Sequence, residues 1–398
     1  MKILITTDLY KPLINGVVTS VMNLKRGLEE KGHEVRVLTL SQDAHSHREE
    51  DVYYIGSINT GWVYPGTRLR IKMPRKFFED IIAWKPDAVH SQCELSTFGY
   101  AKRIANACKA PLIHTYHTVY ENYTHYFCPS VRLGKFLVSG FSRHILNKAD
   151  AVIAPSRKVG NLLERYGVKT DITVIPSGID ISRYIRRPSE QWIETKRSEF
   201  GLTDGTLTMI FIGRLAKEKN VSELLELTGK CKDLPIKLLI VGDGPVRGEL
   251  ENRCKELGIT EKVIFAGMVS PNEVGKYYHL GDVFVNASTS ETQGLTYAEA
   301  MAAGLPMLCK RDECLTGMIK DGVNGWQYHD EGEFRRYLTS LISEETTRAA
   351  MADNAAMTAR DHSVENFAKR VERLYYLSSF IAGTAFRNYS DSSCTLGY

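Results

Sequence analysis

The clearest indication of the fold is Asp282-Val-Phe-Val-Asn286, followed by Ser290-Glu-Thr-Gln-Gly-Leu-Thr-Tyr-Ala-Glu299. Its first part is a short apolar run bounded by turn residues, which predicts a buried strand. Its second part enters a helix that we expect to end near Gly304. A buried strand followed by a helix is the repeating unit of a parallel sheet covered by helices on both faces. The rest of the chain repeats this unit.

Short apolar runs, with helical segments between most of them, occur in two series. The first series comprises Lys2–Thr7, Glu34–Leu40, Asp87–Ser91, Pro111–Tyr116, Ala151–Ala154 and Thr173–Pro176. The second comprises Thr208–Gly213, Lys237–Gly242, Lys262–Gly267, Asp282–Asn286 and Pro306–Cys309. After Gly325 the pattern predicts helices, the last over Val364–Phe380. The sequence therefore predicts an α/β protein with two Rossmann-like parallel-sheet domains facing each other across a cleft, and C-terminal helices.

The expected boundaries follow from composition and from length, since 398 residues suit two domains of ordinary size. We expect a first domain over 1–180, a polar linker over 181–204, a second domain over 205–362, and a C-terminal helix and tail over 363–398. Ligands of open parallel sheets bind beyond the carboxyl ends of the strands, so the chemistry is expected on the loops that follow them.

The composition is that of a soluble globular protein, with 43% hydrophobic and 25% charged residues. No apolar run reaches the length of a membrane span, and the N-terminal run is too short for a signal peptide, so we expect a cytoplasmic protein. The eight cysteines are scattered without a Cys-x-x-Cys pair, which predicts reduced thiols.

The loop after Asn286 offers an anion site. Gly294 lets the chain pass close to a ligand, and the free N–H groups of Leu295 and Thr296 point out of a helix N-terminus, where a diphosphate fits. Glu299 can accept hydrogen bonds from ribose hydroxyls, and Glu291 can reach sugar hydroxyls. The alternative, a capping box formed by Thr296 and Glu299, explains neither Glu291 nor Gly294.

A second loop, Gly213-Arg214-Leu-Ala-Lys-Glu-Lys219, follows the first strand of the second domain. Arg214 and Lys219 can neutralise a leaving diphosphate. Taken alone, Lys217 and Lys219 would favour a solvated charged loop, whereas Arg214, directly after a buried strand and a glycine, does not. No Asp-x-Asp pair, the common holder of a metal–diphosphate complex, occurs in the sequence. We therefore expect no catalytic metal, and no cofactor beyond a sugar donor. Gly242-Asp-Gly244-Pro resembles the start of a dinucleotide fingerprint, but Arg247 replaces its third glycine and argues against NAD.

Two further motifs lie in the first domain. Gly16, at the start of the first helix, permits close approach of a phosphate or a sugar. Three histidines and four tyrosines occur within thirteen residues at the end of a strand, which predicts a polar pocket lined by aromatic rings that suits a sugar. Its candidate binding residues are His114, His117 and Tyr123.

Together these motifs resemble the retaining GT-B glycosyltransferases, the large group that includes bacterial diacylglycerol glucosyltransferases, mannosyltransferases and sucrose synthases. The likeness covers nearly the whole chain. It implies that Arg214 and Lys219 bind the diphosphate of the donor, that Glu299 holds the ribose, and that Glu291 and His117 hold the transferred sugar. It also implies retention of the anomeric configuration, with attack on the face from which the leaving group departs.

The early loop departs from that family in one respect. Many members carry two glycines there, and Asn15 replaces the first of them in this chain. The assignment of Gly16 to the donor therefore rests on a single glycine.

The phrases His114–Tyr126 and Ser290–Tyr297 most resemble the monoglucosyldiacylglycerol synthases, which are bacterial 1,2-diacylglycerol 3-glucosyltransferases. This likeness implies transfer of a hexose, expected to be glucose from UDP-glucose, to a lipid acceptor such as diacylglycerol. Two alternatives remain open. One is a glycosyltransferase acting on a soluble sugar or a polysaccharide, and the other is a membrane-associated protein that binds a sugar nucleotide without turnover.

The charge distribution favours a lipid acceptor. Residues 60–148 hold 13 Lys and Arg against 5 Asp and Glu, whereas residues 181–398 hold 27 against 30. Basic segments with an apolar stripe predict elements that bind the surface of an anionic membrane, although an ordinary amphipathic helix with its apolar side in the core is the alternative. The candidate residues are Arg68, Arg70, Lys72, Arg75, Lys76, Arg132, Lys135, Arg143 and Lys148. We expect a peripheral protein on the inner face of the cell membrane and, without a reader motif, no nucleic-acid partner.

Overall fold

The computed structural model of the chain describes residues 1–13, 15–60, 68–121, 130–381 and 383. It divides into two units. The first unit comprises Met1–Pro155, Gly160–Ile175 and the described part of Ala368–Tyr398, and the second comprises Ser156–Val159 and Pro176–Phe367.

The first unit contains an eight-stranded sheet in the order β10-β9-β8-β7-β1-β2-β4-β3, in which only β3 and β4 pair antiparallel. Its strands are β1 (Lys2–Thr6), β2 (Glu34–Leu40), β3 (His47–Glu49), β4 (Val52–Ile55), β7 (Ala88–Ser91), β8 (Leu112–Thr115), β9 (Ala151–Ala154) and β10 (Ile172–Val174). A hairpin of β5 (Ser57–Asn59) and β6 (Arg68–Arg70) stands apart from this sheet. Ile3, Leu4 and Ile5 are fully buried, as expected for a strand covered on both faces.

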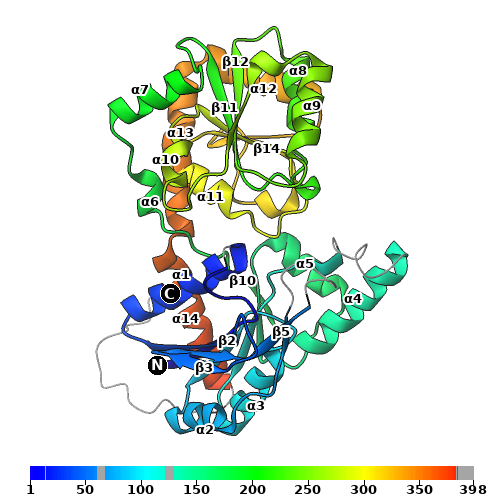
Figure 1. Cartoon of the computed structure of the whole chain (residues 1–398), viewed down its shortest axis with the longest axis vertical. Helices are drawn as coiled ribbons and strands as arrows, with labels where there is room; N and C mark the ends of the chain where they lie inside the picture. Colours follow the sequence, from blue (N-terminus) through cyan, green and yellow to red (C-terminus); the bar gives the residue numbers. More distant parts are fainter. Residues whose placement is uncertain (14, 61–67, 122–129, 382, 384–398) are drawn as a thin grey trace. The chain divides into compact units, whose positions relative to one another are not determined.

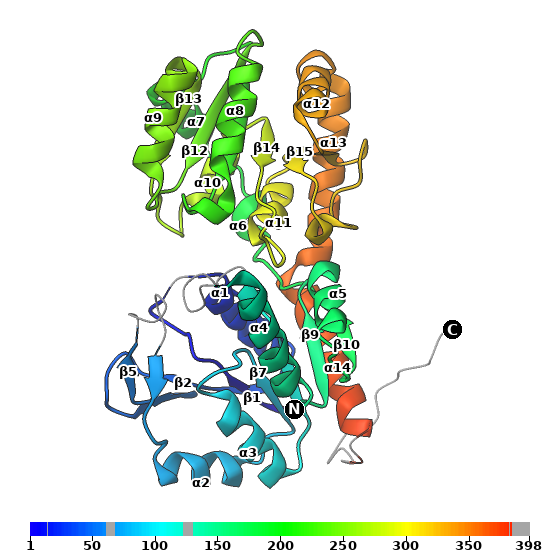
Figure 2. The same ribbon diagram turned by 90° about the vertical axis from the view of Figure 1, so that its right-hand side faces the viewer.

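Helices cover both faces of the first sheet. They are α1 (Gly16–Glu30), α2 (Arg75–Trp84), α3 (Phe98–Cys108), α4 (Val131–Leu146), α5 (Arg157–Arg165) and α14 (Val364–Ile381), of which α5 and α14 have their first residues in the second unit. Figures 1 and 2 show α2 and α3 along one face of the sheet and α1 along the other.

The second unit contains a six-stranded sheet, parallel throughout, in the order β13-β12-β11-β14-β15-β16. Its strands are β11 (Leu207–Ile212), β12 (Ile236–Val241), β13 (Val263–Gly267), β14 (Val283–Asn286), β15 (Met307–Lys310) and β16 (Gly325–Tyr328). This is the 3-2-1-4-5-6 order of a Rossmann sheet, and its direction of winding reverses between β11 and β14. The first unit reverses in the same way between β1 and β7.

The side chains of β11 alternate between two cores in the second unit. Ile210 and Ile212 pack on one side of the sheet, and Met209 and Phe211 pack on the other. The helices that cover these faces are α6 (Ser182–Ile185), α7 (Glu190–Glu199), α8 (Val221–Lys230), α9 (Arg247–Leu257), α10 (Val274–Tyr278), α11 (Leu295–Ala302), α12 (Glu331–Ser343) and α13 (Glu345–Ala359). In Figure 1, α8 and α9 lie on one side of β11 and β12, and α7 and α10 lie on the other.

Each of the eleven predicted strands is present within one or two residues of its expected bounds. The prediction that the chain turns helical directly after Gly325 is wrong, because β16 pairs with β15 before α12 begins. Only four residues long, β16 is too short to show an alternating pattern. The stretch 181–204, for which the sequence predicted a linker, carries α6 and α7 and buries Tyr184, Ile193 and Leu202 in the second unit.

None of the helices in the described part of the chain combines the length with the apolar character that a membrane span needs.

Candidate functional site

In the second unit the two candidate loops follow β11 and β14, the strands at which the winding reverses. After β11 the chain passes Arg214 and a 3₁₀ turn over Lys217–Lys219, and after β14 it passes Glu291 and enters α11. The two strands are hydrogen-bonded neighbours, so their carboxyl ends carry both loops to one edge of the sheet. This is the position at which sheets of this type bind ligands.

Charged side chains from the two loops meet. Lys219 Nζ donates to Glu291 Oε1 at 2.5 Å, and both side chains are largely buried. Arg214, by contrast, is exposed, and its guanidinium makes no hydrogen bond or ion pair with any residue that the structure describes. The loops thus offer one cation that already holds a carboxylate and one that is available to an anion.

Backbone contacts hold the same two loops together. The hydroxyl groups of Ser288 and Ser290 donate to the carbonyl oxygen of Glu218 at 3.2 and 2.8 Å. The Asn220 amide donates to the carbonyl oxygen of Ala287 at 3.4 Å. Such contacts fix the loops before a ligand arrives, which lowers the cost of binding.

The two glycines of Gly242-Asp-Gly244 allow the loop after β12 to pack closely against the loop after β11. A Cβ on Gly242 would lie 2.0 Å from the carbonyl oxygen of Gly213, and a Cβ on Gly244 would lie 2.2 Å from that of Leu215. The loop after β12 therefore rests directly on the backbone of the loop that carries Arg214. The glycines are needed for contact between loops, and this accounts for the partial resemblance to a dinucleotide fingerprint.

The N-terminus of α11 has the geometry of an anion site. Gly294 is its N-cap, with φ of 73°, and a Cβ there would lie 2.3 Å from the ring of Tyr297. No side chain caps the helix, and the N–H groups of Leu295 and Thr296 donate to no described residue outside α11. Thr296 lies inside the helix, so the capping box considered above is not formed.

Glu299 lies one turn further into α11, with its carboxyl group held by two phenols. Tyr278 Oη donates to Glu299 Oε2 at 2.7 Å, and Tyr184 donates a second hydrogen bond to this carboxyl group. Burial raises the pKa of Glu299, and the two hydrogen bonds oppose part of that shift. Neither tyrosine was predicted from the sequence.

Gln293 anchors the loop before α11. Its buried amide accepts from the Ser177 backbone N–H at 2.8 Å and donates to the Ser177 carbonyl oxygen at 2.9 Å. Lys158 donates to the carbonyl oxygen of Thr289 at 2.6 Å and pairs with Asp312 at 2.7 Å. These contacts lie within the second unit and hold Glu291 and Gly294 in place.

In the first unit polar side chains gather where β7 and β8 end. Glu94, which is 4% exposed, accepts from His114 Nε2 at 3.1 Å and from Tyr120 Oη at 2.6 Å. His114 is fully buried beneath it. The structure therefore shows that His114 holds Glu94 through Nε2, and the contact of His114 with a sugar stays a prediction.

His117 lies beside this group. Its Nε2 is 2.6 Å from Gln92 Oε1, and burial lowers its pKa to about 4. The imidazole is therefore neutral near pH 7, donates from Nε2 to Gln92, and keeps Nδ1 as an acceptor. Gln92 Nε2 and His114 Nδ1 are buried and have no hydrogen-bond partner among the described residues. Unpaired buried polar atoms favour a ligand or water at this position.

The sequence did not single out Gln92 and Glu94. Their position directly after the predicted strand Asp87–Ser91 could have marked them as candidates, because ligands bind beyond the carboxyl ends of such strands. Gly16 begins α1 as predicted, and Asn15 caps this helix by accepting from the Val18 N–H at 2.9 Å. Tyr123 lies outside the described residues.

The first basic segment is engaged within the first unit. Arg68 donates to Ser57 Oγ and to the Gln42 carbonyl oxygen, both at 2.6 Å, and Arg70 lies over the ring of Tyr100. Phe77, which directly follows this basic segment, packs against Tyr53. Arg68 therefore stabilises the hairpin of β5 and β6. Its position in a basic segment had predicted membrane binding instead. Lys72, Arg75 and Lys76 are exposed.

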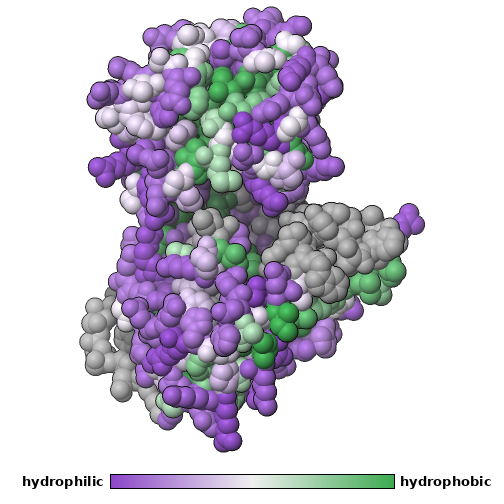
Figure 3. All heavy atoms as spheres, in the orientation of Figure 1, coloured by the Kyte–Doolittle hydropathy of each residue, from purple (hydrophilic) through white to green (hydrophobic). Residues whose placement is uncertain are grey.

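The second basic segment, α4, has the surface that was predicted. One side of the helix is buried through Val138, Ser142 and Leu146. Four large apolar side chains remain exposed: Leu133, Phe136, Leu137 and Phe141. Figure 3 shows apolar residues at the surface in this part of the molecule. Arg132, Lys135 and Arg143 are exposed on the same helix, and Lys148 follows it, 2.7 Å from His144 Nε2.

Comparisons with known proteins agree with this arrangement. Residues 14–183 match the family described as Glycosyltransferase Family 4, and residues 193–358 match the family described as Glycosyl transferases group 1. The chain is 34% identical over 388 residues to the alpha-monoglucosyldiacylglycerol synthase of Streptococcus pneumoniae, a match that covers 96% of the chain and 87% of that protein. It is 32% identical over 391 residues to the alpha-monoglucosyldiacylglycerol synthase of Acholeplasma laidlawii, covering 94% of the chain and 96% of that protein.

Solved structures share the fold. Anabaena HepE in complex with UDP superposes with a TM-score of 0.73 at 16% identity, over 95% of this chain and 100% of that one. Sucrose-phosphate synthase of Thermosynechococcus elongatus superposes with a TM-score of 0.72 at 20% identity, over 96% and 99%. The chain has two parallel-sheet units, and its relatives are glycosyltransferases. It therefore belongs to the GT-B glycosyltransferases that combine a Glycosyltransferase Family 4 domain with a Glycosyl transferases group 1 domain.

Proposed function

We propose that this glycosyltransferase moves glucose from UDP-glucose to diacylglycerol at the surface of an anionic membrane, with retention of the anomeric configuration and without a metal ion. The observation that carries the proposal is the set of groups at the β11 and β14 edge of the second unit. A free arginine, a lysine–glutamate pair, an uncapped helix N-terminus and a carboxyl group held by two phenols all lie there. Each matches one part of a nucleotide sugar.

The diphosphate of the donor is bound by the N–H groups of Leu295 and Thr296 together with Arg214 and Lys219. A helix N-terminus carries partial positive charge, and the two cations add full charges. These groups stabilise the diphosphate as negative charge develops on it, when the bond between C1 of glucose and the phosphate oxygen breaks. No carboxylate pair for a metal ion is required.

The ribose and the transferred sugar are bound by two glutamates of the same loop. Glu299 accepts hydrogen bonds from the ribose hydroxyls, with its orientation fixed by Tyr278 and Tyr184. Glu291, fixed by Lys219, accepts hydrogen bonds from hydroxyls of the sugar. In the first unit, neutral His117 offers Nδ1 to a sugar hydroxyl, as the family resemblance implies.

The acceptor is proposed from the relatives and from α4. Two relatives above 30% identity are named alpha-monoglucosyldiacylglycerol synthases. The glucose of UDP-glucose is α-linked, so an α-linked product from it requires retention. Exposed apolar and basic side chains on α4 suit peripheral binding to anionic lipid.

The test is transfer by the purified protein from a panel of nucleotide sugars, with diacylglycerol in phosphatidylglycerol vesicles or with soluble sugars as acceptors. We expect transfer from UDP-glucose to diacylglycerol, and NMR of the product should show an α linkage. Transfer to soluble sugars alone, or a β-linked product, would contradict the proposal. Binding of UDP without any turnover would show a binding protein.

A further inference from the structure

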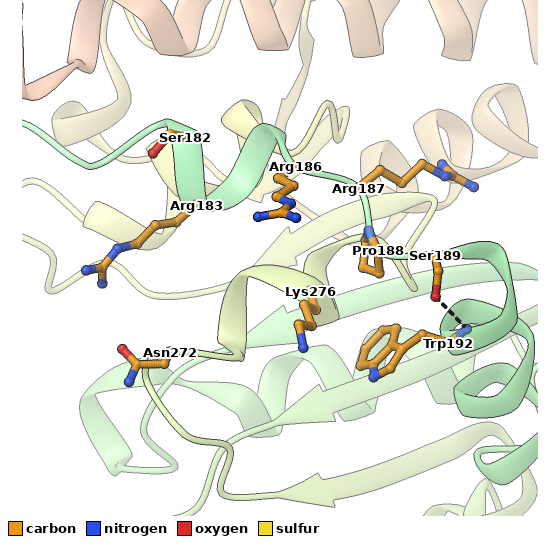
Figure 4. Close-up of a pocket in the computed structure, with 9 residues that line it drawn as sticks. All are labelled: Ser182, Arg183, Arg186, Arg187, Pro188, Ser189, Trp192, Asn272 and Lys276. Carbon is orange, nitrogen blue, oxygen red and sulfur yellow. Dashed lines mark hydrogen bonds between the residues drawn. The ribbon is translucent and has the colours of Figure 1, made fainter.

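A cavity lined by several cations lies in the second unit, away from the candidate donor loops along the sequence. Its volume is about 660 Å³. It is lined by residues from α6, from the segment 186–189 that joins α6 to α7, from the start of α7, and from α10 with the turn before it. The lining includes four cations, Arg183, Arg186, Arg187 and Lys276, together with Trp192, and it includes no carboxylate. Figure 4 shows Arg186 and Lys276 in the middle of the lining, with Arg183 and Trp192 on either side.

The charges of this pocket are compensated for three of the four cations, and Arg186 is the exception. Arg186 is exposed and makes no hydrogen bond or ion pair with a described residue. Each of the other three cations has one acidic partner three residues away, outside the lining, at 3.0 to 3.3 Å. The four cations and their three carboxylate partners leave one positive charge, that of Arg186, without a partner among the described residues. The positive potential at Arg186 would be relieved by an anion.

We propose that this pocket binds the phosphate group of a phosphate ester. Guanidinium groups bind phosphate oxygens in a bidentate manner, and Arg186 is available to do so while Lys276 lies beside it in the lining. Trp192 supplies a flat wall for the organic part of the ester. A soluble ester and the headgroup of an anionic phospholipid share this chemistry.

The pocket is linked to Glu299 through the two short helices that form its walls. Tyr184 of α6 and Tyr278 of α10 both donate to the Glu299 carboxyl group. The helices also touch each other, since His279 Nε2 donates to the Tyr184 carbonyl oxygen at 2.7 Å. A Cβ on Gly275 of α10 would lie 2.4 Å from the carbonyl oxygen of Arg183.

Binding at the pocket therefore acts on the donor site. Helices of four and five residues are not stable alone, so their position depends on what they pack against. An ester that bridges Arg186 and Lys276 holds α6 against α10 and fixes both phenols on Glu299. The coupling is reciprocal, because each ligand must raise the affinity of the other by the same factor. This coupling rests on the proposed role of Glu299 in donor binding, whereas the pocket itself does not.

The first experiment tests the pocket by calorimetric titration of the full chain with glycerol 3-phosphate. Saturating UDP is present, so that the probe cannot occupy the donor loops. We expect Arg186→Gln and Lys276→Gln each to weaken binding about tenfold or more, the effect of losing about 1.4 kcal/mol. Lys255→Gln, a change at an exposed lysine of α9 outside the pocket, is the matched control and should bind as the parent does.

A second arm distinguishes the source of the phosphate. Co-sedimentation with phosphatidylcholine vesicles that contain phosphatidylglycerol is measured for the same variants. Loss of glycerol 3-phosphate binding with unchanged sedimentation assigns the pocket to a soluble ester, and loss of sedimentation assigns it to a lipid headgroup. Parent-like behaviour of both Arg186→Gln and Lys276→Gln in both arms overturns the site.

The coupling is measured by comparing the dissociation constant of UDP with and without glycerol 3-phosphate. We expect glycerol 3-phosphate to tighten UDP binding about fivefold or more, and we expect Tyr184→Phe to abolish the change. Competition at the donor loops would weaken UDP binding instead, so unchanged or weakened affinity overturns the coupling. A protein that shows the pocket and the coupling but transfers no glucose to diacylglycerol would contradict the proposed function and leave this inference standing.

Discussion

Lys219 Nζ lies 2.5 Å from Glu291 Oε1, so a single ion pair joins the loop after β11 to the loop after β14. The contact forms because β11 and β14 are neighbours although seventy residues, 213–282, separate them in the sequence. In the proposed mechanism Lys219 therefore serves two partners: the glutamate that is proposed to bind the sugar, and the diphosphate that is proposed to leave it.

Replacing Lys219 with alanine should lower kcat about 100-fold or more, because the cation is needed most when charge develops on the diphosphate. Steady-state kinetics with UDP-glucose measures the change. Lys217→Ala removes an exposed lysine from the same turn and should leave kcat near that of the parent. Equal losses in the two variants would show that only the net charge of the loop matters.

Replacing Glu299 with alanine should weaken UDP binding roughly 10- to 100-fold, since a hydrogen bond to a charged group contributes about 1.5–3 kcal/mol. Calorimetric titration of UDP measures this. Tyr278→Phe keeps the ring and removes the hydrogen bond to Glu299, so it should weaken binding by a smaller factor. Unchanged affinity in the Glu299 variant would place the ribose elsewhere.

The placement of these groups shows what sequence could and could not predict. Apolar runs located the eleven predicted strands, and the residues after β11 and β14 were visible as candidates because they follow such runs. Strand order was not visible, so the contact of Lys219 with Glu291 could not be anticipated. Tyr184 was missed because its polar surroundings resemble a linker, and Glu94 because its partners come from another strand.

The low pKa of His117 predicts a pH effect on stability. Its pKa is about 4 in the folded chain and about 6.5 when unfolded, so between these values the unfolded state binds more protons. The stability that neutral His117 provides is complete above pH 6.5 and is lost as the pH falls towards 4. The free energy of unfolding falls by about 3 kcal/mol at most. Urea unfolding between pH 4 and 7 should show a shallower loss for His117→Gln, and parallel curves would contradict the assignment.

Activity should survive a strong chelator, because Arg214, Lys219 and the N-terminus of α11 provide the positive charge that a metal ion would otherwise supply. Transfer assays with and without EDTA measure this. Loss of activity in EDTA, restored by magnesium or manganese, would require a metal in the mechanism.

The last prediction concerns α4. Phe136 is 71% exposed and lies on a helix with three exposed basic residues, whereas Arg68 and Phe77 of the other basic segment are engaged within the first unit. We therefore expect α4 to provide most of the affinity for anionic lipid. Each basic residue near such a surface contributes about 1 kcal/mol, and the apolar side chains add burial in the interface.

Phe136→Ser combined with Arg132→Glu and Lys135→Glu should release the protein from phosphatidylglycerol vesicles in co-sedimentation, while UDP binding stays that of the parent. Met357→Ser, which replaces a side chain on α13 that is 65% exposed, controls for the loss of a surface apolar group and should sediment as the parent does. Salt should weaken the binding of the parent, since attraction between charges decays over a Debye length of about 10 Å at 0.1 M. Salt does not weaken the burial of apolar side chains in the membrane interface, so some binding should persist at high salt in the parent. The triple variant should show none. If the triple variant sediments as well as the parent, another surface docks the enzyme on lipid.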